Sequence, residues 1–366
     1  MTASAKQTVV LDVMGADSGA GEIILGGLDA ATRVGDALQV ILVGRRDIIE
    51  KFLAEQPVVP KNIEILHAES EVPMGMPATE GARIRNSSIA IGIGLVKDKK
   101  ADAFVSPGNT GAVMATALLT LGRISQVSRP AIATMFPSAT GRPTVVLDVG
   151  ANAESKPQHL AQFAVMGSVF ASVMLNLESP RVGLLSIGEE RSKGNELILN
   201  AHEFLKGSHI NFVGNIEGRD ILSGEVDVAV TDGFTGNVLL KFAESVKPML
   251  TKHIQRQVQS NIFSRIGVFL LLPFLRRMNK SLDYAERGGA PLLGVNGNII
   301  ICHGSSGSRA ISNAVKSAFE MSSKKILEVI HDKLAKEHFE KDNGEKNKSQ
   351  DNRDRVLYAA TGDDQR

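Results

Sequence analysis

Residues 144–174, TVVLDVGANAESKPQHLAQFAVMGSVFASVM, contain the pattern that decides the fold. A β-branched run at 144–149 leads into a Gly and Asn turn and then into a segment with helical periodicity. Apolar and small residues recur in that segment at spacings of three and four, which is typical of a helix packed on one face. They are Leu160, Phe163, Ala164, Gly167, Phe170, Ala171 and Met174. The stretch predicts a strand, a tight turn and a closely packed helix.

The same order of strand, turn and helix recurs along the chain. Several candidate strands are apolar on both faces, as expected for strands that helices cover on both sides. The candidate strands are residues 9–13, 40–43, 63–66, 103–106, 144–149, 182–187, 210–213, 226–231 and 298–302. This alternation predicts an α/β fold built on a parallel sheet.

Composition excludes several classes of protein. The 366 residues are 43% hydrophobic, which is enough to bury a large core. Forty-one Lys and Arg against 40 Asp and Glu leave almost no net charge, so nucleic acid is not an expected partner. The single cysteine, Cys302, excludes an internal disulfide framework, and we expect it to be structural. The first 13 residues lack the apolar core and cleavage site of a secretory signal, so the expected location is cytoplasmic.

The organisation of the chain follows from its apolar content. We expect residues 1–330 to form a single α/β domain. From His331 onward Lys, Glu, Asp, Asn and Gln dominate, so residues 331–366 are predicted to be a disordered polar tail. The longest apolar run, residues 266–275, is about half of the roughly 20 residues that a membrane span requires, so no span is expected.

Small polar turns follow at least five of the candidate strands: DVMGAD at 12–17, SPGNTG at 106–111, DVGAN at 148–152, SIGEE at 186–190 and TDGFTGN at 231–237. In a parallel sheet these turns lie at the carboxyl edge, where α/β proteins form their ligand crevice, so we expect them to converge on one site. Each turn also opens a helix, whose free backbone N–H groups favour an anion. The expected substrate- or phosphate-binding residues are Asp12, Gly15, Asp17, Ser106, Gly108, Asn109, Thr110, Gly111, Asn152, Glu189, Gly233, Thr235 and Gly236.

A single turn of this kind is weak evidence, because Gly-Asn-Thr-Gly is more often only a helix cap. None of the five ends in the Gly-Lys-Ser/Thr of a nucleotide phosphate loop, and none has the Gly-x-Gly-x-x-Gly spacing of a dinucleotide site. We therefore expect no nucleotide cofactor. His67, His159, His202 and His209 show no metal-ligand spacing, so no metal is expected.

The turns occur in order with five further motifs: RPA at 129–131, QFAVMG at 162–167, KGNE at 193–196, GNIEGRD at 214–220 and GAPLLG at 289–294. Together, from about Val9 to about Ser322, they resemble the bacterial phosphate acyltransferases that begin phospholipid synthesis. The sequence departs from the usual pattern at Ala16, Pro107, Ser155 and the stretch 84–86, which bears on substrate preference more than on reaction type.

The resemblance implies a Rossmann-like three-layer fold related to phosphate acetyltransferases and isocitrate dehydrogenases. It implies transfer of a long-chain acyl group from acyl carrier protein to inorganic phosphate, and delivery of the acyl-phosphate to a membrane glycerol-3-phosphate acyltransferase. It further implies a homodimer that sits in the cytoplasm and contacts the inner face of the cell membrane peripherally.

The residues suit that chemistry independently. Inorganic phosphate is itself the nucleophile, and a thiol of pKa about 8.5 leaves as thiolate, so the enzyme has to position two anions and stabilise an oxyanion. Lys193 is the first candidate for countering the charge, with a solvated surface lysine as the alternative. Asn237 and Asn109 would orient the phosphate or the carbonyl, or else cap helices.

Two further catalytic candidates have alternatives of equal weight. Asp232 would anchor Lys193 or order a helix N-terminus, and His303 would donate to phosphate or be a hydrogen-bonded structural histidine. Two other functions also fit an anion-binding α/β chain: a metal- and nicotinamide-dependent dehydrogenase, and a phosphate-binding membrane scaffold without catalysis. The first should carry a cluster of aspartates and a substrate-binding arginine set, which the sequence lacks.

Residues 247–287 leave the strand and helix rhythm and predict a projecting helical hairpin broken near Pro273. Its apolar tip is flanked by Arg265, Arg276, Arg277 and Lys280, which suits contact with anionic headgroups. The alternative is burial at a dimer interface. The expected membrane-contact residues are Val268, Phe269, Leu270, Leu271, Leu272 and Phe274.

Overall fold

The computed structural model describes residues 6–259, 267–268, 270–271, 274 and 288–337. Within them, eleven strands form one continuous sheet in the order β3-β2-β1-β4-β11-β10-β5-β6-β9-β7-β8. The strands are β1 Gln7–Asp12, β2 Leu38–Gly44, β3 Ile63–His67, β4 Ala103–Ser106, β5 Ala131–Phe136, β6 Thr144–Leu147, β7 Val182–Leu185, β8 Phe212–Ile216, β9 Val228–Val230, β10 Ala290–Leu293 and β11 Asn298–Ile301.

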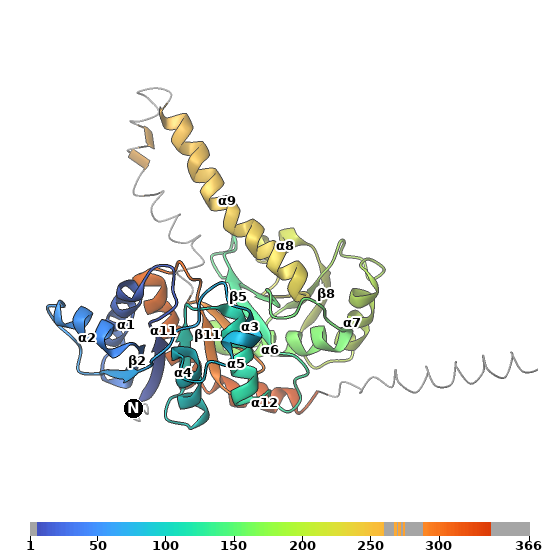
Figure 1. Ribbon diagram of the computed structural model, residues 1–366. Helices are drawn as coiled ribbons and strands as arrows, with labels where there is room; N and C mark the ends of the chain where they lie inside the picture. Colours follow the sequence, from blue (N-terminus) through green and yellow to red (C-terminus); the bar gives the residue numbers. More distant parts are fainter. Residues whose placement is uncertain (1–5, 260–266, 269, 272–273, 275–287, 338–366) are drawn as a thin grey trace, which may run out of the picture.

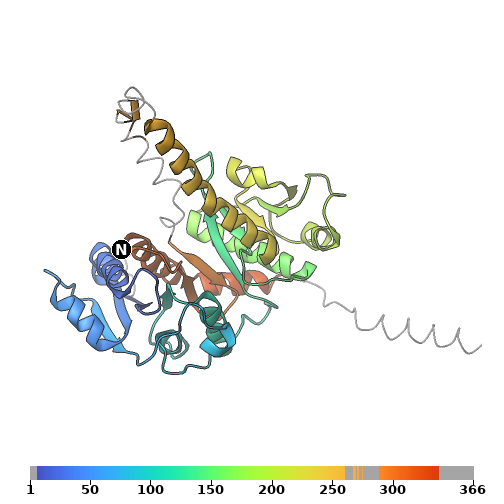
Figure 2. The same cartoon turned by 45° about the horizontal axis from the view of Figure 1, so that its top comes forward.

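Helices cover both faces of the sheet, which gives three layers (Figures 1 and 2). Alternate strand residues point to opposite faces, so Val9 and Leu11 belong to one apolar cluster and Val10 belongs to the other. The first cluster includes α1, α6, α7, α11 and α12, and the second includes α4, α5 and α8. The helices are α1 Ala20–Val34, α2 Arg46–Ala54, α3 Ala78–Gly81, α4 Ser88–Lys97, α5 Thr110–Leu121, α6 Pro157–Leu175, α7 Glu196–Lys206, α8 Gly218–Ser223, α9 Gly233–Gln259, α11 Ser308–Ser323 and α12 Ile326–Leu334, with the 3₁₀ turn η1 Gly35–Ala37.

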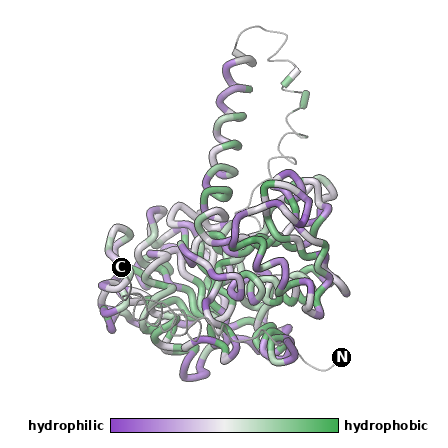
Figure 3. Tube along the Cα trace, turned by 90° about the vertical axis from the view of Figure 1, so that its right-hand side faces the viewer, coloured by the Kyte–Doolittle hydropathy of each residue, from purple (hydrophilic) through white to green (hydrophobic). Residues whose placement is uncertain are grey.

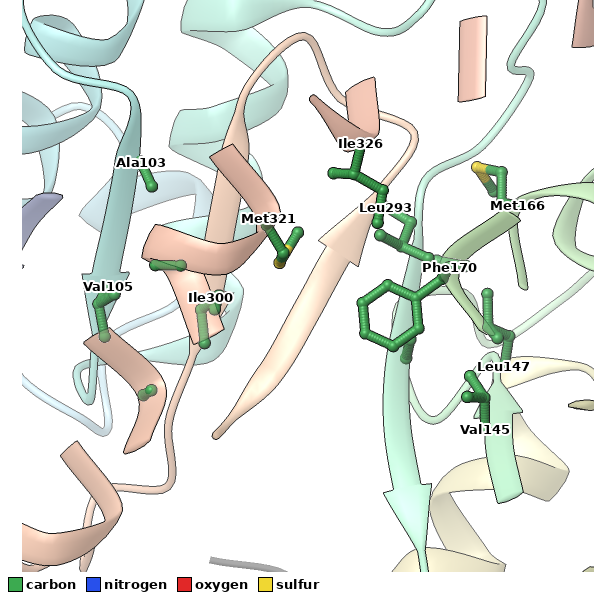
Figure 4. Packing of buried hydrophobic residues seen from close by; sticks show 14 of the residues in the cluster. Ala103, Val105, Val145, Leu147, Met166, Phe170, Leu293, Ile300, Met321 and Ile326 are labelled. Atoms are coloured by element: carbon green, nitrogen blue, oxygen red, sulfur yellow. The ribbon is translucent and has the colours of Figure 1, made fainter. Parts of the chain in front are cut away.

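The core joins the two ends of the sheet. Figure 4 shows part of the first cluster, with Phe170 of α6, Leu293 of β10 and Ile326 of α12 packed together. Helix α6 is long and apolar enough to span a membrane, but 72% of its apolar window is buried inside the fold, as in the core helix of any α/β protein. Residues 160–174, whose periodicity predicts a helix packed on one face, therefore belong to a helix that is buried on almost all sides.

The predicted α/β, Rossmann-like three-layer fold is confirmed, but the sheet is mixed and not parallel throughout. Strand β10 is antiparallel to both β11 and β5, and β5 is antiparallel to β6. Strands β5 and β10 are not among the candidate strands. Strand β10 is only four residues long and contains Pro291. We call β3-β2-β1-β4-β11 the first half and β6-β9-β7-β8 the second half. The strands within each half are parallel, but the two halves run in opposite directions.

The register along β5 brings the carboxyl ends of the two halves together. Ile132 of β5 pairs with Leu292, which pairs with Ile299 of β11, so the last β11 residue lies two positions further, level with Thr134. On the other side of β5, the last residue of β6, Leu147, pairs with Ala133. Both sets of turns therefore begin at the same level of the central strand.

The helical excursion begins earlier than expected, since α9 starts at Gly233 and runs for 27 residues through Pro248. It projects from the body of the protein (Figures 1 and 3). Of the expected tip residues, Leu270, Leu271 and Phe274 are 73%, 53% and 64% exposed, and Val268 is partly buried. Phe269, Leu272 and the second arm of the expected hairpin lie outside the described residues.

The expected start of the tail at His331 falls inside α12, which continues to Leu334. Ile330 and Leu334 are buried, so the segment contributes to the core despite its charged neighbours. Glu337 anchors the end of this segment, because its carboxylate accepts the backbone N–H of His209 at 3.2 Å. Residues 338–366 lie outside the described part of the chain.

Candidate functional site

A cavity of about 380 Å³ lies where the two halves of the sheet meet on β5. The turns after β4 and β11 line it from the first half, the turn after β6 and the start of α9 from the second half, and β5 and β10 from between. Its lining residues are Thr110, Ile132, Thr134, Val149, Gly150, Asn237, Leu240, Lys241, Glu244, Gly289, Ala290, Ile301, Cys302, His303, Ser305, Ser306, Gly307 and Ala310.

Asp148 organises the turn after β6. One carboxylate oxygen accepts the backbone N–H groups of Ile132, Gly150 and Ala151, at 2.9 to 3.1 Å. The other oxygen accepts the backbone and side-chain N–H groups of Asn152, at 2.8 and 2.9 Å. Burial raises the pKa of Asp148, while the bonds from Ala151, Asn152 and Ile132 oppose that rise. Asn152 is consumed by this network, because its amide also donates to the Pro130 carbonyl at 2.7 Å.

The first turn of α9 presses directly against this organised turn. A Cβ atom on Gly233 would lie 2.4 Å from the Asn152 carbonyl oxygen, and one on Gly236 would lie 1.9 Å from the Asp148 carbonyl oxygen. Only glycine allows so close an approach of two backbones. The contact places Asn237 against Gly150, whose own Cβ would lie 3.4 Å from Asn237 Oδ1. The expected glycines therefore bring Asn237 to the cavity without lining it themselves.

Helix α9 contributes a polar face that the pattern of turns does not predict. Asn237, Leu240, Lys241 and Glu244 all line the cavity, at the spacings of three and four that define one helix face. Lys241 Nζ forms an ion pair with Glu244 Oε2 at 2.9 Å. The signal was present in the sequence as Lys and Glu three residues apart, one turn after Asn237.

Asp12 performs a structural role at the end of β1. It is fully buried, and it accepts the Ser106 hydroxyl at 2.7 Å and the Met14 backbone N–H at 3.0 Å. Burial raises the pKa of Asp12 to about 6. Ser106 in turn accepts the Gly108 backbone N–H at 3.1 Å. These expected site residues fasten the turn after β4 to β1.

Asn109 caps the start of α5, which is the alternative role expected for it. Its Oδ1 accepts the Ala112 backbone N–H at 3.0 Å, and its Nδ2 donates to the carbonyls of Pro73, Met74 and Met76. Gly111 also serves packing, because its Cβ would lie 2.9 Å from the Ala78 methyl. Thr110, between them, is the residue of this turn that lines the cavity.

His303 lines the cavity and is exposed. Its Nδ1 accepts the Ser305 backbone N–H at 3.2 Å and lies 2.8 Å from the Ser305 hydroxyl. Because Nδ1 is an acceptor, the neutral imidazole carries its proton on Nε2. The neutral ring can therefore donate a hydrogen bond from Nε2.

The turn after β1 does not reach this cavity. Gly15 and Asp17 line a separate cavity of about 450 Å³ together with Glu71, and none of its described lining residues is Lys or Arg. Two carboxylates, with no cationic side chain in the described lining, disfavour phosphate there. The turn after β1 contacts the turn after β11, because the Gly304 carbonyl accepts the Ser18 backbone N–H at 3.2 Å.

The turn after β7 does not line either cavity. Lys193 is exposed, and Glu189 forms a surface ion pair with Arg219 at 2.8 Å. Asp232 caps α9, because it accepts the Thr235 backbone N–H at 2.9 Å and hydroxyl at 2.7 Å. Over the described residues it makes no ion pair with Lys193, so the helix-ordering alternative holds for Asp232. Nor do those residues contain a group of three or more His, Cys, Asp or Glu that could hold a metal ion.

Comparison with known proteins shows the family to which the chain is similar. The model of a family described as fatty acid synthesis protein matches residues 7–329. A phosphate acyltransferase of Heliobacterium modesticaldum is 48% identical over 312 residues, 85% of this chain and 92% of the relative. One of Moorella thermoacetica is 46% identical over 325 residues, 88% of this chain and 95% of the relative.

Solved structures share the fold at low sequence identity. A phosphotransacetylase from Streptococcus pyogenes matches with a TM-score of 0.59 and 17% identity, over 88% of this chain and 94% of its own. The EutD phosphotransacetylase from Staphylococcus aureus matches with a TM-score of 0.57 and 18% identity, over 87% and 94%. These likenesses establish the Rossmann-like α/β architecture.

Proposed function

We propose, on the premise that this chain belongs to the fatty acid synthesis protein family and is a phosphate acyltransferase, that it transfers a long-chain acyl group from acyl carrier protein to inorganic phosphate. The observation that carries the proposal is the mixed lining of the cavity on β5. Ile132, Val149 and Ile301 provide apolar surface, and Asn237, Lys241 and His303 provide polar groups. A thioester with a fatty chain and an inorganic anion need both kinds of surface.

The chemical step requires little covalent participation by the protein. A phosphate oxygen attacks the thioester carbonyl carbon, a C–O bond forms and the C–S bond breaks. The electron pair leaves with sulfur as thiolate, which takes a proton from solvent. His303 and Asn237 both line the cavity. In this proposal His303 Nε2–H and the Asn237 amide donate to the oxyanion that forms between these events, while the cavity holds the two substrates together.

No Ser or Cys nucleophile is needed for this step. Cys302 lines the cavity but is buried, and burial raises the pKa of its thiol to about 12. A thiol with so high a pKa is a poor nucleophile near neutral pH. The part of the cavity that Cys302 lines is apolar, which suits the acyl chain.

The test is a direct trap of the product. Protein, acyl carrier protein thioester and inorganic phosphate are mixed, and hydroxylamine then converts acyl-phosphate to a hydroxamate. We expect phosphate-dependent hydroxamate together with release of the free thiol. Thiol release without phosphate dependence would show a hydrolase, and NAD binding with oxidation of a hydroxy acid and formation of NADH would show the dehydrogenase alternative.

The proposal extends to the cell membrane, where a glycerol-3-phosphate acyltransferase would take the product. What supports it is the exposure of Leu270, Leu271 and Phe274 beyond the projecting helix α9. Large apolar side chains this exposed are typical of a surface that binds a membrane or a partner. A cytoplasmic protein with this tip would sit peripherally on the inner face and release acyl-phosphate next to its acceptor.

Vesicle sedimentation tests the tip. Leu270→Asp with Leu271→Glu should lower binding to anionic vesicles by about 100-fold, because two leucines lose roughly 3 kcal/mol of apolar burial. Activity in solution should stay within about twofold of the parent. Equal sedimentation of the double variant, or its conversion from dimer to monomer, would contradict the membrane assignment.

A homodimer is the remaining part of the proposal. What supports it is a second exposed apolar stripe at the base of α9, formed by Phe234, Val238 and Phe242 at spacings of four. Sedimentation equilibrium with Phe242→Glu, which lies on that stripe and not on the tip, separates subunit contact from membrane contact.

A further inference from the structure

The phosphate in the proposed reaction needs a positive partner inside the cavity on β5. Inorganic phosphate carries one to two negative charges near neutral pH, and an unpaired charge in a partly enclosed cavity is costly. The sequence favours Lys193 for this role, but Lys193 does not line the cavity. Lys241 is the one Lys or Arg among its described lining residues.

Lys241 stands one helical turn after Asn237 on the same face of α9. Residues four apart on a helix have Cβ atoms about 6 Å apart, which is the separation needed for two side chains to contact one tetrahedral anion. The first turn of α9 is fixed against the Asp148 turn through Gly233 and Gly236. Both side chains therefore project from a helix whose position is set by backbone contact.

Glu244 restrains the lysine. Its carboxylate accepts one N–H of Lys241 Nζ at 2.9 Å, and its side chain is only 19% exposed, whereas that of Lys241 is 56% exposed. An ammonium group has three N–H donors, so two remain for a ligand. A lysine held by one bond loses less conformational freedom on binding the anion than a free one.

We propose that Lys241 binds the phosphate in this cavity and that Glu244 is a positioning residue that holds Lys241 Nζ toward it. The inference rests on the proposed function for the identity of the anion. It places the phosphate-binding group on α9, in the cavity on β5. The turn after β7 does not have to move toward the cavity.

Steady-state kinetics with hydroxamate detection tests the assignment. Lys241→Met, which keeps the length of the side chain and removes its charge, should lower kcat/KM for phosphate by about 100-fold, as expected for loss of a charge-assisted hydrogen bond. The KM for the acyl carrier protein thioester should change by less than about threefold. Lys241→Arg should recover at least about a tenth of the parent value.

The positioning role has its own readout. Glu244→Gln should raise the KM for phosphate by about tenfold, and it should add nothing in the Lys241→Met background, since the residue it positions is then absent. Lys252→Met is the matched control on the same helix, three turns further along and exposed, and it should leave both KM values unchanged. If the effects of Glu244→Gln and Lys241→Met on the KM for phosphate add in the double variant, Glu244 acts independently of Lys241 and the positioning role is wrong.

Phosphate binding alone separates this inference from the proposed reaction. Titration calorimetry with inorganic phosphate should show about tenfold weaker binding to Lys241→Met than to the parent. If the parent makes no acyl hydroxamate but the affinity difference holds, the reaction is wrong and the anion site stands. Unchanged phosphate affinity and unchanged KM in a folded Lys241→Met would overturn the inference.

Discussion

The inner and outer turns of the sheet have similar sequences but different surroundings. Counting outward from β5, the first two strands of each half, β11 and β4 on one side and β6 and β9 on the other, lead into residues that line the cavity. The third strand of each half, β1 and β7, ends in an equally polar, glycine-containing turn that does not. Neighbouring strands lie about 4.8 Å apart, so the third strand begins about 10 Å from the first. Distance from the point where the halves meet, and not turn composition, decides which turn lines the cavity.

The largest expected effect belongs to an inner turn. Asn237→Ala should lower kcat by about 100- to 1000-fold, equivalent to roughly 3–4 kcal/mol, because it removes an amide donor from a preformed site. Turnover is measured by hydroxamate formation, with the melting temperature as a check on folding. The comparison breaks if the folded variant keeps parental turnover.

An outer turn should instead show its effect in stability. Asp12 ionises with a pKa of 3.8 in the unfolded chain and about 6 in the fold. Below pH 3.8 the carboxyl is neutral in both states, and between pH 3.8 and 6 only the unfolded chain loses its proton. Stability from this group is thus present at low pH and falls as pH rises through that window, by about 3 kcal/mol.

Asp12→Asn removes this titration. Its melting temperature relative to that of the parent should therefore rise by several degrees between pH 4 and pH 7.5. Calorimetry at both pH values measures the difference, and any constant cost of the amide cancels. A difference that does not change with pH would show that Asp12 is ionised throughout.

The smallest effect is expected at the other outer turn. Lys193→Met should lower kcat/KM by about twofold, because an exposed ammonium acting over about 10 Å through water contributes about 0.4 kcal/mol. Lys193→Arg should restore most of that loss, since only the charge acts at this distance. A loss as large as that of Asn237→Ala would show that the turn after β7 contacts the reacting groups directly.

Much of the fold could be predicted from local pattern. Residues 103–106 form β4 with the predicted bounds, and the other eight candidate strands match within a few residues at their ends. The missed strands are β5 and β10, whose antiparallel pairing depends on partners more than 150 residues apart in the chain. Short strands next to Pro130 and around Pro291 give little periodicity to detect.

The candidate site was predictable in its chemistry and less so in its members. Three of the predicted residues line the cavity: Thr110, Asn237 and His303. Four others form hydrogen bonds with groups of the protein itself: Asp12, Ser106, Asn109 and Asn152. A polar residue at the end of a strand satisfies either role equally well by sequence. Lys241 and Glu244 were missed because they lie within a helix, beyond the turn itself.

The sequence by itself determined the units of this protein: apolar strands, polar turns with glycine, and helices that begin directly after them. Each unit depends on residues only a few positions apart, so periodicity and turn chemistry are enough to define it. The tertiary structure decided which units meet. The antiparallel pair β5 and β10 reverses the second half of the sheet and sets its register, so the carboxyl ends of β11 and β6 arrive at one level and enclose the cavity. Hydrophobic pattern specifies which face of a strand is buried but not which strand lies beside it. That choice of neighbours placed Lys241, and not Lys193, in the lining of the cavity.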